Sequence, residues 1–300
     1  MKVLDLFCGA GGFSYGFHQE GFNTVAGVDI DAKCREPFEA NHPDATFVCG
    51  DLKQLEPDDL KHWKPDIIIG SPPCIHFSSI NPHKDGDAIL VDRFFHFVDA
   101  LKPRYFVLEN VPEAGPSVAG LRNGVRRGNS VHATVLNALD FGSGSKRNRL
   151  FYGNFPVPMP THTMNPLQSR LDGTQLLPWR VLEDSLELGI NWGYLRPDVV
   201  TMLRGVKTRK DWNVPFPDAS YQVARCVLAS CHKMNQNTFV IQDRGGFRLL
   251  TVREHARLQG FPDSFRWFGG YYDIISQIGN AVPPPLSQAI ARAIKKEAAQ

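Results

Sequence analysis

The chain has 300 residues, a formal net charge of +2 and 42% hydrophobic residues, which is typical of a soluble protein with one large or two moderate domains. No apolar run approaches the roughly 18 residues that a membrane span needs, and the N-terminus lacks the pattern of a signal peptide. The six cysteines include no CxxC pair, which argues against a zinc site or a disulfide scaffold. We therefore expect a cytoplasmic protein with no membrane association and no metal.

Short apolar segments alternate with helical patterns through the first half of the chain. The predicted strands are residues 3–7, 24–29, 46–49, 65–70, 104–110 and 149–154. The predicted helices contain Phe13 and Phe17, residues 94–101, and residues 135–139. This alternation, with strands apolar on both faces, predicts an α/β fold with a doubly wound parallel sheet.

The character of the sequence changes after Phe155. Residues 156–246 begin with a proline-rich stretch and show no regular period, whereas helical patterns return at 249–261 and 283–298. The second region therefore reads as a smaller, irregular domain. The predicted boundaries are 1–155, completed by 275–300, for the first domain and 156–274 for the second.

Glycines or carboxylates follow each of the first three predicted strands. In an open α/β sheet, ligands bind outside the carboxyl ends of the strands, and Gly9 and Gly11 would let a ligand approach the backbone. Asp29 could accept hydrogen bonds from two ribose hydroxyls, and Asp51 from an adenine amino group. Taken singly, such residues are often turns or helix caps. Ser14 replaces the third glycine of GxGxxG and no phosphate loop is present, so an adenosine-containing ligand is favoured over NAD or ATP.

Reactive side chains follow the fourth and fifth predicted strands. In GSPPC, two prolines hold Cys74 at the end of the fourth strand, and Glu109 ends the fifth. Arg147 and Arg149 precede the next strand and are candidates to stabilise a thiolate. A single cysteine is more often a packing residue, and Glu109 alone could be a structural ion-pair partner, so the order of the motifs carries the argument.

That order resembles the DNA (cytosine-5) methyltransferase family along nearly the whole chain. DLFCGAGGFSYGF resembles its cofactor motif, GSPPCIHFS its Pro-Cys motif, ENV its glutamate motif and KRNR its arginine motif. RLLTVREHARLQGFPD and QIGNAVPPPLSQAIA resemble its last two motifs, and 156–246 falls where the family keeps its target-recognition domain. The resemblance implies a Rossmann-like sheet, S-adenosylmethionine as methyl donor, S-adenosylhomocysteine as product and double-stranded DNA as substrate.

The resemblance also assigns roles to individual residues. It makes Cys74 the nucleophile and adds Glu109, Arg147 and Arg149 to the catalytic set. The cofactor-binding residues that it implies are Phe7, Gly9, Gly11, Asp29, Ile30, Asp51, Leu52, Pro72, Asn280 and Val282. The DNA-binding residues that it implies are Ser78, Arg126, Arg127, Arg225 and Arg244.

The chemistry that follows requires a base flipped out of the duplex. The Cys74 thiolate would add to C6 of cytosine, which makes C5 able to attack a sulfonium methyl group. A protonated Glu109, its pKa raised by burial, would donate to N3 and accept from the N4 amino group. Arg149 would contact O2. A base then removes the C5 proton and the thiolate leaves.

Two segments depart from the family pattern. Gly144-Ser145 stands where the family usually has Pro-Gln, which predicts a looser loop without the glutamine amide. Ile75 stands where a glutamine usually follows the cysteine, and the next residue, His76, could replace some of the lost hydrogen bonds.

Three alternatives stay open at this point. A transfer-RNA methyltransferase of the same fold would carry a Cys-Phe-Thr signature, which this sequence lacks. A DNA-binding module that keeps only the fold would not need Cys74, Glu109 and Arg149 together. An unrelated nucleotide-binding protein could use Cys74 for packing. We expect a monomer that acts on DNA, with a cognate restriction enzyme as a second partner of the same system.

Overall fold

The structure is a computed structural model, and it falls into two compact units. The residues that it describes are 1–73, 89–115, 125–126, 129–162, 224, 226–231, 233, 240–243 and 246–300. Unit 1 consists of residues 1–141, 148–161 and 281–300, and unit 2 of residues 142–147 and 162–280. Each unit is described by itself below.

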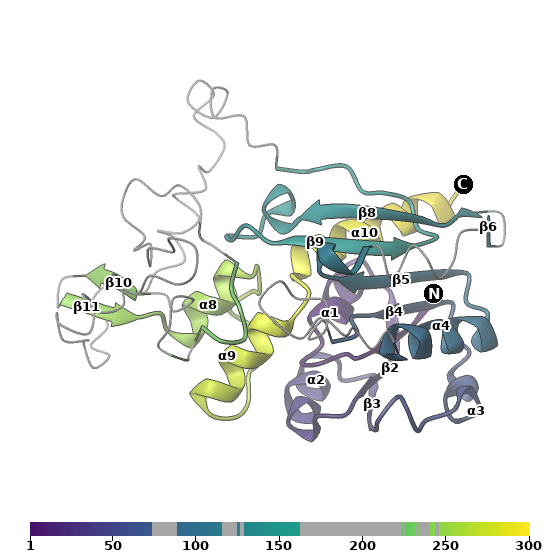
Figure 1. Ribbon diagram of the computed structural model, residues 1–300, viewed down its shortest axis with the longest axis horizontal. Coiled ribbons are helices and arrows are strands. Elements are labelled where there is room, and N and C mark those ends of the chain that lie inside the picture. The colour runs from purple at the N-terminus through teal and green to yellow at the C-terminus, as the bar shows by residue number, and fades with distance from the viewer. Residues whose placement is uncertain are drawn as a thin grey trace. The chain divides into compact units, whose positions relative to one another are not determined.

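A seven-stranded mixed sheet forms the centre of unit 1, with the strand order β3-β2-β1-β4-β5-β9-β8 (Figure 1). The strands are β1 Lys2–Leu6, β2 Asn23–Asp29, β3 Thr46–Cys49, β4 Ile67–Gly70, β5 Tyr105–Asn110, β8 His132–Asn137 and β9 Asn148–Gly153. Strands β1 to β5 pair in parallel, whereas β9 runs antiparallel to both β5 and β8. The α/β prediction is confirmed, and the sheet is mixed rather than wholly parallel because of β9.

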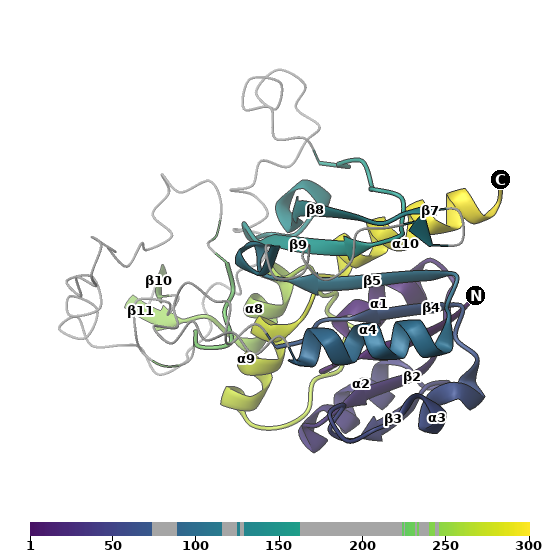
Figure 2. The ribbon, with the colours of Figure 1, turned by 45° about the vertical axis from the view of Figure 1, so that its right-hand side comes forward.

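Helices cover both faces of this sheet, as Figure 2 shows. They are α1 Gly12–Gln19, α2 Arg35–Asn41, α3 Pro57–Leu60, α4 Ile89–Leu101 and α10 Pro284–Ala298. Side chains alternate along β1: Val3 lies in one apolar core with residues of α1 and α10, whereas Leu4 and Leu6 lie in a second core with phenylalanines of α4. The strands are therefore buried on both faces, as a doubly wound sheet requires.

The last helix of the chain is built into unit 1 through α1. The Ser287 hydroxyl donates a hydrogen bond to the Phe13 carbonyl over 2.8 Å, and the Glu20 carboxylate accepts one from Arg292 over 2.8 Å. A Cβ added at Gly16 would lie 1.8 Å from the Ser287 hydroxyl oxygen, so only glycine allows this close approach. Residues at the two ends of the sequence thus form one core.

The predicted helix at 135–139 is wrong. Residues 132–137 form strand β8, which pairs with β9, and a short 3₁₀ helix, η4 Ala138–Phe141, follows. Along the strand, Val135 is 53% exposed and Leu136 is 9% exposed, which is the alternation of an edge strand. Pairing with β9 therefore outweighs the helical propensity of the leucines and alanine in this stretch.

Unit 2 contains a hairpin and two helices in its described part. Strands β10 Val240–Asp243 and β11 Gly246–Leu249 pair antiparallel, and α8 Val252–Leu258 and α9 Tyr271–Asn280 follow. A capping box starts α8, because the Thr251 hydroxyl accepts from the Glu254 N–H and the Glu254 carboxylate accepts from the Thr251 N–H. The sequence patterns predict α8, but they do not predict α9.

The remaining short elements lie in unit 1. They are η1 Ala32–Cys34, η2 Lys61–Trp63, η3 Pro112–Ala114, β6 Val125–Arg126 and β7 Asn129–Ser130. Among the described helices, none is both long and apolar enough to cross a membrane. Most of the predicted irregular region lies outside the described residues.

Candidate active site

A tight turn follows β1 and leads into α1. Phe7, Gly9 and Gly11 all adopt left-handed backbone angles, with φ of 62°, 51° and 91°. A left-handed phenylalanine is strained by roughly 1 kcal/mol or more, so the surrounding contacts have to hold it. A Cβ added at Gly9 would meet no described atom within 4 Å, so the backbone there faces open space. We call residues 7–11 the glycine turn.

The Asp29 carboxylate holds the glycine turn from the end of β2. One oxygen accepts a hydrogen bond from the Gly9 N–H over 2.8 Å, and the other accepts from the Asp31 N–H over 2.9 Å. Burial raises the pKa of the Asp29 carboxyl above its ordinary value, and these two hydrogen bonds oppose that shift. Beside it, Ile30 is 67% exposed, which is unusual for a large apolar side chain.

The end of β3 lies next to the end of β2. The Gly50 N–H donates to the Asp29 carbonyl over 2.9 Å, and the Asp51 carboxylate accepts from the Lys53 N–H over 2.9 Å. Leu52 is buried at 3% exposure. Predicted residues of the first three strands therefore gather at one edge of the sheet.

The segment that leads to Cys74 starts between β1 and β5. The Ser71 N–H donates to the Leu6 carbonyl over 3.3 Å, and the Asn110 amide donates to the Pro72 carbonyl over 3.1 Å. Pro72 is buried. These bonds fix the backbone two residues before Cys74, although Cys74 and Ser78 themselves lie outside the described residues.

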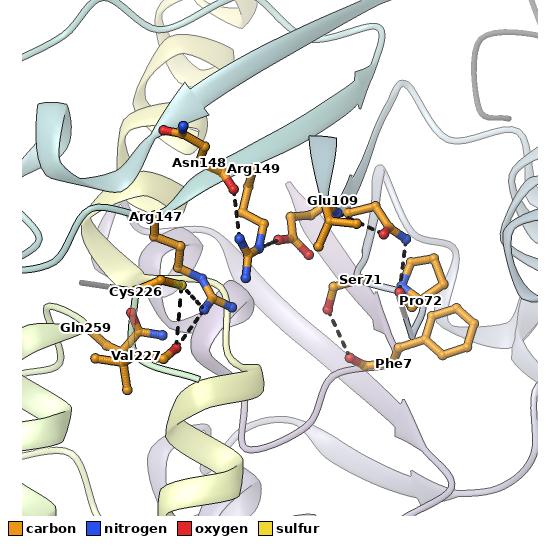
Figure 3. A network of polar contacts seen from close by, with 12 residues as sticks. Phe7, Ser71, Pro72, Glu109, Arg147, Asn148, Arg149, Cys226, Val227 and Gln259 are labelled. Atoms are coloured by element: carbon orange, nitrogen blue, oxygen red, sulfur yellow. Dashed lines mark hydrogen bonds and ion pairs between the residues drawn. The ribbon is translucent and has the colours of Figure 1, made fainter. Parts of the chain in front are cut away.

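Glu109 and Arg149 form a buried ion pair within unit 1 (Figure 3). The Arg149 Nε lies 3.0 Å from the Glu109 Oε1, and their side chains are 13% and 8% exposed. Glu109 pairs with Phe151 across β5 and β9, and Arg149 is two residues before Phe151, so the two side chains are diagonal neighbours. Arg149 also donates to the Asn148 carbonyl over 2.7 Å.

The second predicted arginine has its contacts in unit 2. Arg147 is 3% exposed; its Nη1 donates to the Val227 carbonyl over 3.0 Å and lies 3.3 Å from the Cys226 sulfur (Figure 3). Arg149 is thus paired with Glu109 in unit 1, whereas Arg147 binds residues 226 and 227 within unit 2.

The Gly-Ser segment before the arginines is more firmly held than expected. Ser143 and Ser145 are buried at 2% and 0% exposure. The Ser143 hydroxyl donates to the Leu258 carbonyl over 3.0 Å, and the Ser145 hydroxyl donates to the Gln259 amide oxygen over 3.4 Å. The prediction of a loose loop is therefore wrong, because both hydroxyls bind the end of α8 and the residue after it.

The other predicted residues are placed as follows. Asn280 is exposed at the end of α9 in unit 2, and Val282 is buried at 2% exposure in the core of unit 1. The backbone of Arg126 lies in β6. Arg127, Arg225 and Arg244 lie outside the described residues.

Three residues near these motifs make contacts that the sequence motifs do not predict. Asp5 is fully buried in β1 and accepts a hydrogen bond from the Ser14 hydroxyl; burial raises the pKa of its carboxyl to about 7. Asn110 holds Pro72, and His42 contacts the glycine turn. A usable signal existed for Asp5, since a charged residue within the apolar run VLDLF needs a partner in the core.

Fold and site together define a Rossmann-like methyltransferase fold, with a glycine turn that no described side chain covers at Gly9 and a buried acid–arginine pair beside the segment leading to Cys74. The model of the C-5 cytosine-specific DNA methylase family matches residues 1–165 and 188–296. The chain belongs to this family, as the sequence motifs predicted.

Relatives above 30% identity agree with this assignment, and a solved structure agrees with the fold. The chain is 31% identical to the type II methyltransferase M1.HphI of Haemophilus parahaemolyticus, over 99% of this chain and 87% of the relative. It is 32% identical to M.NgoFVII of Neisseria gonorrhoeae, over 98% and 86%. The Dnmt2 methyltransferase of S. pombe superposes with a TM-score of 0.70 at 19% identity, covering 99% of both chains, and so supports the fold alone.

Proposed function

We propose that the protein is a DNA (cytosine-5) methyltransferase that transfers a methyl group from S-adenosylmethionine to C5 of a flipped-out cytosine in a specific duplex sequence. The observation that carries this proposal is the buried pair of Glu109, near the end of β5, and Arg149, near the start of β9. Strand β5 lies next to β4, which leads to Cys74. Family membership and the type II methyltransferases among the relatives support it.

The edge formed by β1, β2 and β3 fits the methyl donor. Gly9 leaves open space over the turn, Asp29 presents a fixed carboxylate and Ile30 presents an exposed apolar surface, which together suit a ribose and an adenine ring. Asp51 would accept from the adenine amino group. S-adenosylmethionine, when bound, supplies an electrophilic methyl group, and S-adenosylhomocysteine is the product.

The remaining cofactor residues are proposed by motif. Phe7 and Gly11 would line the methionine end, and Leu52 and Pro72 would close the pocket. Asn280 and Val282 would complete it from the terminal motif; since the Val282 side chain is buried, its backbone is the part that could contact a ligand. Among the described residues, no group of three His, Cys, Asp or Glu side chains could hold a metal ion.

The nucleophile in this mechanism is the Cys74 thiolate, which forms a bond to C6 of the base. The electron pair displaced from the C5–C6 bond would then form the bond from C5 to the methyl group, while the methyl–sulfur bond of the donor breaks and its electron pair stays on sulfur. Glu109 donates a proton to N3 while Arg149 contacts O2. The ion pair with Arg149 orients the Glu109 carboxyl before the base arrives.

The reaction ends by elimination. A base removes the C5 proton, the C5–C6 double bond re-forms, the Cys74 thiolate leaves, and N3 returns its proton to Glu109. Because none of these atoms is accessible in stacked DNA, the base must be flipped out at a cost of a few kcal/mol. Ser78, Arg126, Arg127, Arg225 and Arg244 are the proposed DNA contacts that offset this cost.

Target specificity is proposed to lie in residues 156–246 of the second domain, whose proposed bounds are 156–274. Exchanging residues 156–246 for the equivalent block of a relative with another target should transfer the methylated sequence to the hybrid. A hybrid that stays active on the original site would show that this domain assignment is wrong. The protein is further proposed to act as a cytoplasmic monomer, alongside a cognate restriction enzyme.

A direct comparison of substrates tests the proposed function. Methyl incorporation from labelled S-adenosylmethionine should occur in duplex DNA and not in transfer RNA. Bisulfite-type sequencing of DNA from the expression host should then show 5-methylcytosine at one recurrent sequence. Incorporation into transfer RNA alone would favour the first alternative, and binding of DNA without incorporation would favour a non-enzymatic module.

A further inference from the structure

His42 follows α2 and contacts the glycine turn from within the core of unit 1. Its side chain is 2% exposed, and its Nε2 lies 3.1 Å from the Gly11 carbonyl oxygen. The ring packs on Phe38 at a centroid distance of 4.8 Å and meets Tyr15 edge-on at 6.1 Å. Aromatic packing thus fixes the direction in which the ring presents Nε2.

The contact defines where the imidazole proton lies. A carbonyl oxygen only accepts, so Nε2 carries the proton and donates it to Gly11. Nδ1 has no hydrogen-bond partner within the described residues. Burial lowers the pKa of His42 to about 4, and His18 of α1 adds to that shift, so the ring is neutral at pH 7.

Gly11 depends on this ring in two ways. Its carbonyl accepts from the Tyr15 N–H over 2.8 Å, in the first turn of α1, and also from His42. Its left-handed backbone places a hypothetical Cβ 2.6 Å from the His42 Nε2. The imidazole therefore occupies the space of a side chain at position 11 and bonds the carbonyl beside it.

The glycine turn is thus held at two points by one stretch of chain. Asp29, at the end of β2, binds the Gly9 N–H, and His42, after α2, binds the Gly11 carbonyl. In the first bond the Asp29 side chain is the acceptor, and in the second the His42 side chain is the donor. Between them lies the backbone that faces open space at Gly9.

We propose that His42 is a positioning residue for the methyl donor: its Nε2–H bond to the Gly11 carbonyl shapes the glycine turn before the cofactor binds. This inference rests on the proposed function. A turn that is already ordered loses less conformational entropy when it closes on a ligand, which raises affinity without a new ligand contact. His42 itself does not touch the reacting atoms in this account.

Titration calorimetry with S-adenosylhomocysteine tests the proposal on purified full-length variants. His42→Leu removes the donor and should weaken binding about tenfold, whereas His42→Gln, whose amide can replace Nε2–H, should stay within about threefold of the wild type. His62→Leu, at an exposed position, is the matched control and should bind as the wild type does. Equal affinity of the Leu variant and the wild type, or a Gln variant as weak as the Leu variant, would overturn the proposal.

A second measurement determines the tautomer of His42 in the wild-type protein. In the ¹⁵N spectrum of the wild-type imidazoles at pH 7, His42, assigned through the signal lost in His42→Gln, should show a protonated Nε2 and a bare Nδ1. This neutral tautomer should persist down to about pH 5, because burial lowers the pKa of His42 to about 4. A protonated Nδ1 would contradict the assignment. Failure of the wild type to bind S-adenosylhomocysteine would instead refute the proposed function. The tautomer measurement needs no cofactor, so it would still test the hydrogen bond from His42 to Gly11.

Discussion

Two glycine-containing segments, the glycine turn at residues 7–11 and the Gly-Ser segment at 142–145, look alike in sequence and differ in structure. At Gly9 a Cβ would meet no described atom within 4 Å, whereas at Gly142 it would lie 3.0 Å from the His162 ring. The first segment leaves its backbone open to a ligand. The second has its serines buried in hydrogen bonds to Leu258 and Gln259 within unit 2. Neighbouring side chains, rather than the glycines, decide which segment can bind a ligand.

The comparison predicts that substitutions at the open edge of unit 1 change chemistry or binding, while those in the Gly-Ser segment change stability. The largest effect is expected at Glu109. Glu109→Gln keeps the shape but cannot donate an acid proton to N3, so kcat should fall by about 100-fold or more. Because the change also leaves Arg149 without its anionic partner, the melting temperature should fall as well. Single-turnover methylation measures this, with exposed Glu113→Gln as control. An active Gln variant would remove Glu109 from the mechanism.

The next effect is expected at Asp29. Asp29→Ala removes the acceptor for the Gly9 N–H and for the ribose, so S-adenosylmethionine affinity should fall by on the order of 2–4 kcal/mol. DNA affinity should fall much less. Calorimetry for the cofactor and a gel-shift assay for DNA separate the two. Unchanged cofactor affinity would contradict the position given to Asp29.

A pH-dependent effect is expected at Asp5. Because burial raises the pKa of its folded-state carboxyl to about 7, the folded protein keeps a proton between pH 4 and 7 that the unfolded chain has released. This group's contribution to stability is therefore lost progressively as pH rises from about 4 to 7, by on the order of 4 kcal/mol in total. Asp5→Asn should lack that loss. Its free energy of unfolding, measured by urea denaturation, should therefore rise relative to that of the wild type from pH 5 to 8. Parallel curves for the two proteins would refute the assignment.

The smallest effect is expected in the Gly-Ser segment. Ser143→Ala leaves the Leu258 carbonyl without its hydroxyl donor, so unfolding should become easier by about 1 kcal/mol. The kcat of the folded enzyme should stay unchanged, because this hydroxyl holds α8 and not a substrate. Exposed Ser130→Ala is the control. A large loss of kcat without a loss of stability would show that the Gly-Ser segment affects catalysis, which would contradict the distinction between the two segments.

Much of unit 1 could be predicted from sequence because its strands are short apolar runs that end in glycine or a polar residue. β3 was predicted to the residue, whereas residues 135–139 were misassigned because pairing with β9 is a long-range property. Of the candidate site, Glu109 and Arg149 were found by motif, and their pairing follows from the register of β5 and β9. The roles of Asn110 and His42 could not be predicted, since each depends on a contact more than 30 residues away in sequence.

The proposed methyl-transfer mechanism requires that Cys74 forms a covalent bond to the target base. Duplex DNA carrying 5-fluorocytosine at the target has no C5 proton to lose, so methyl transfer should leave the protein trapped on it. The adduct should require S-adenosylmethionine and survive a denaturing gel. Cys74→Ser should abolish both the adduct and turnover, because a serine hydroxyl is scarcely ionised at neutral pH. An adduct that persists in the Ser variant, or an active wild-type enzyme that forms none, would contradict the account.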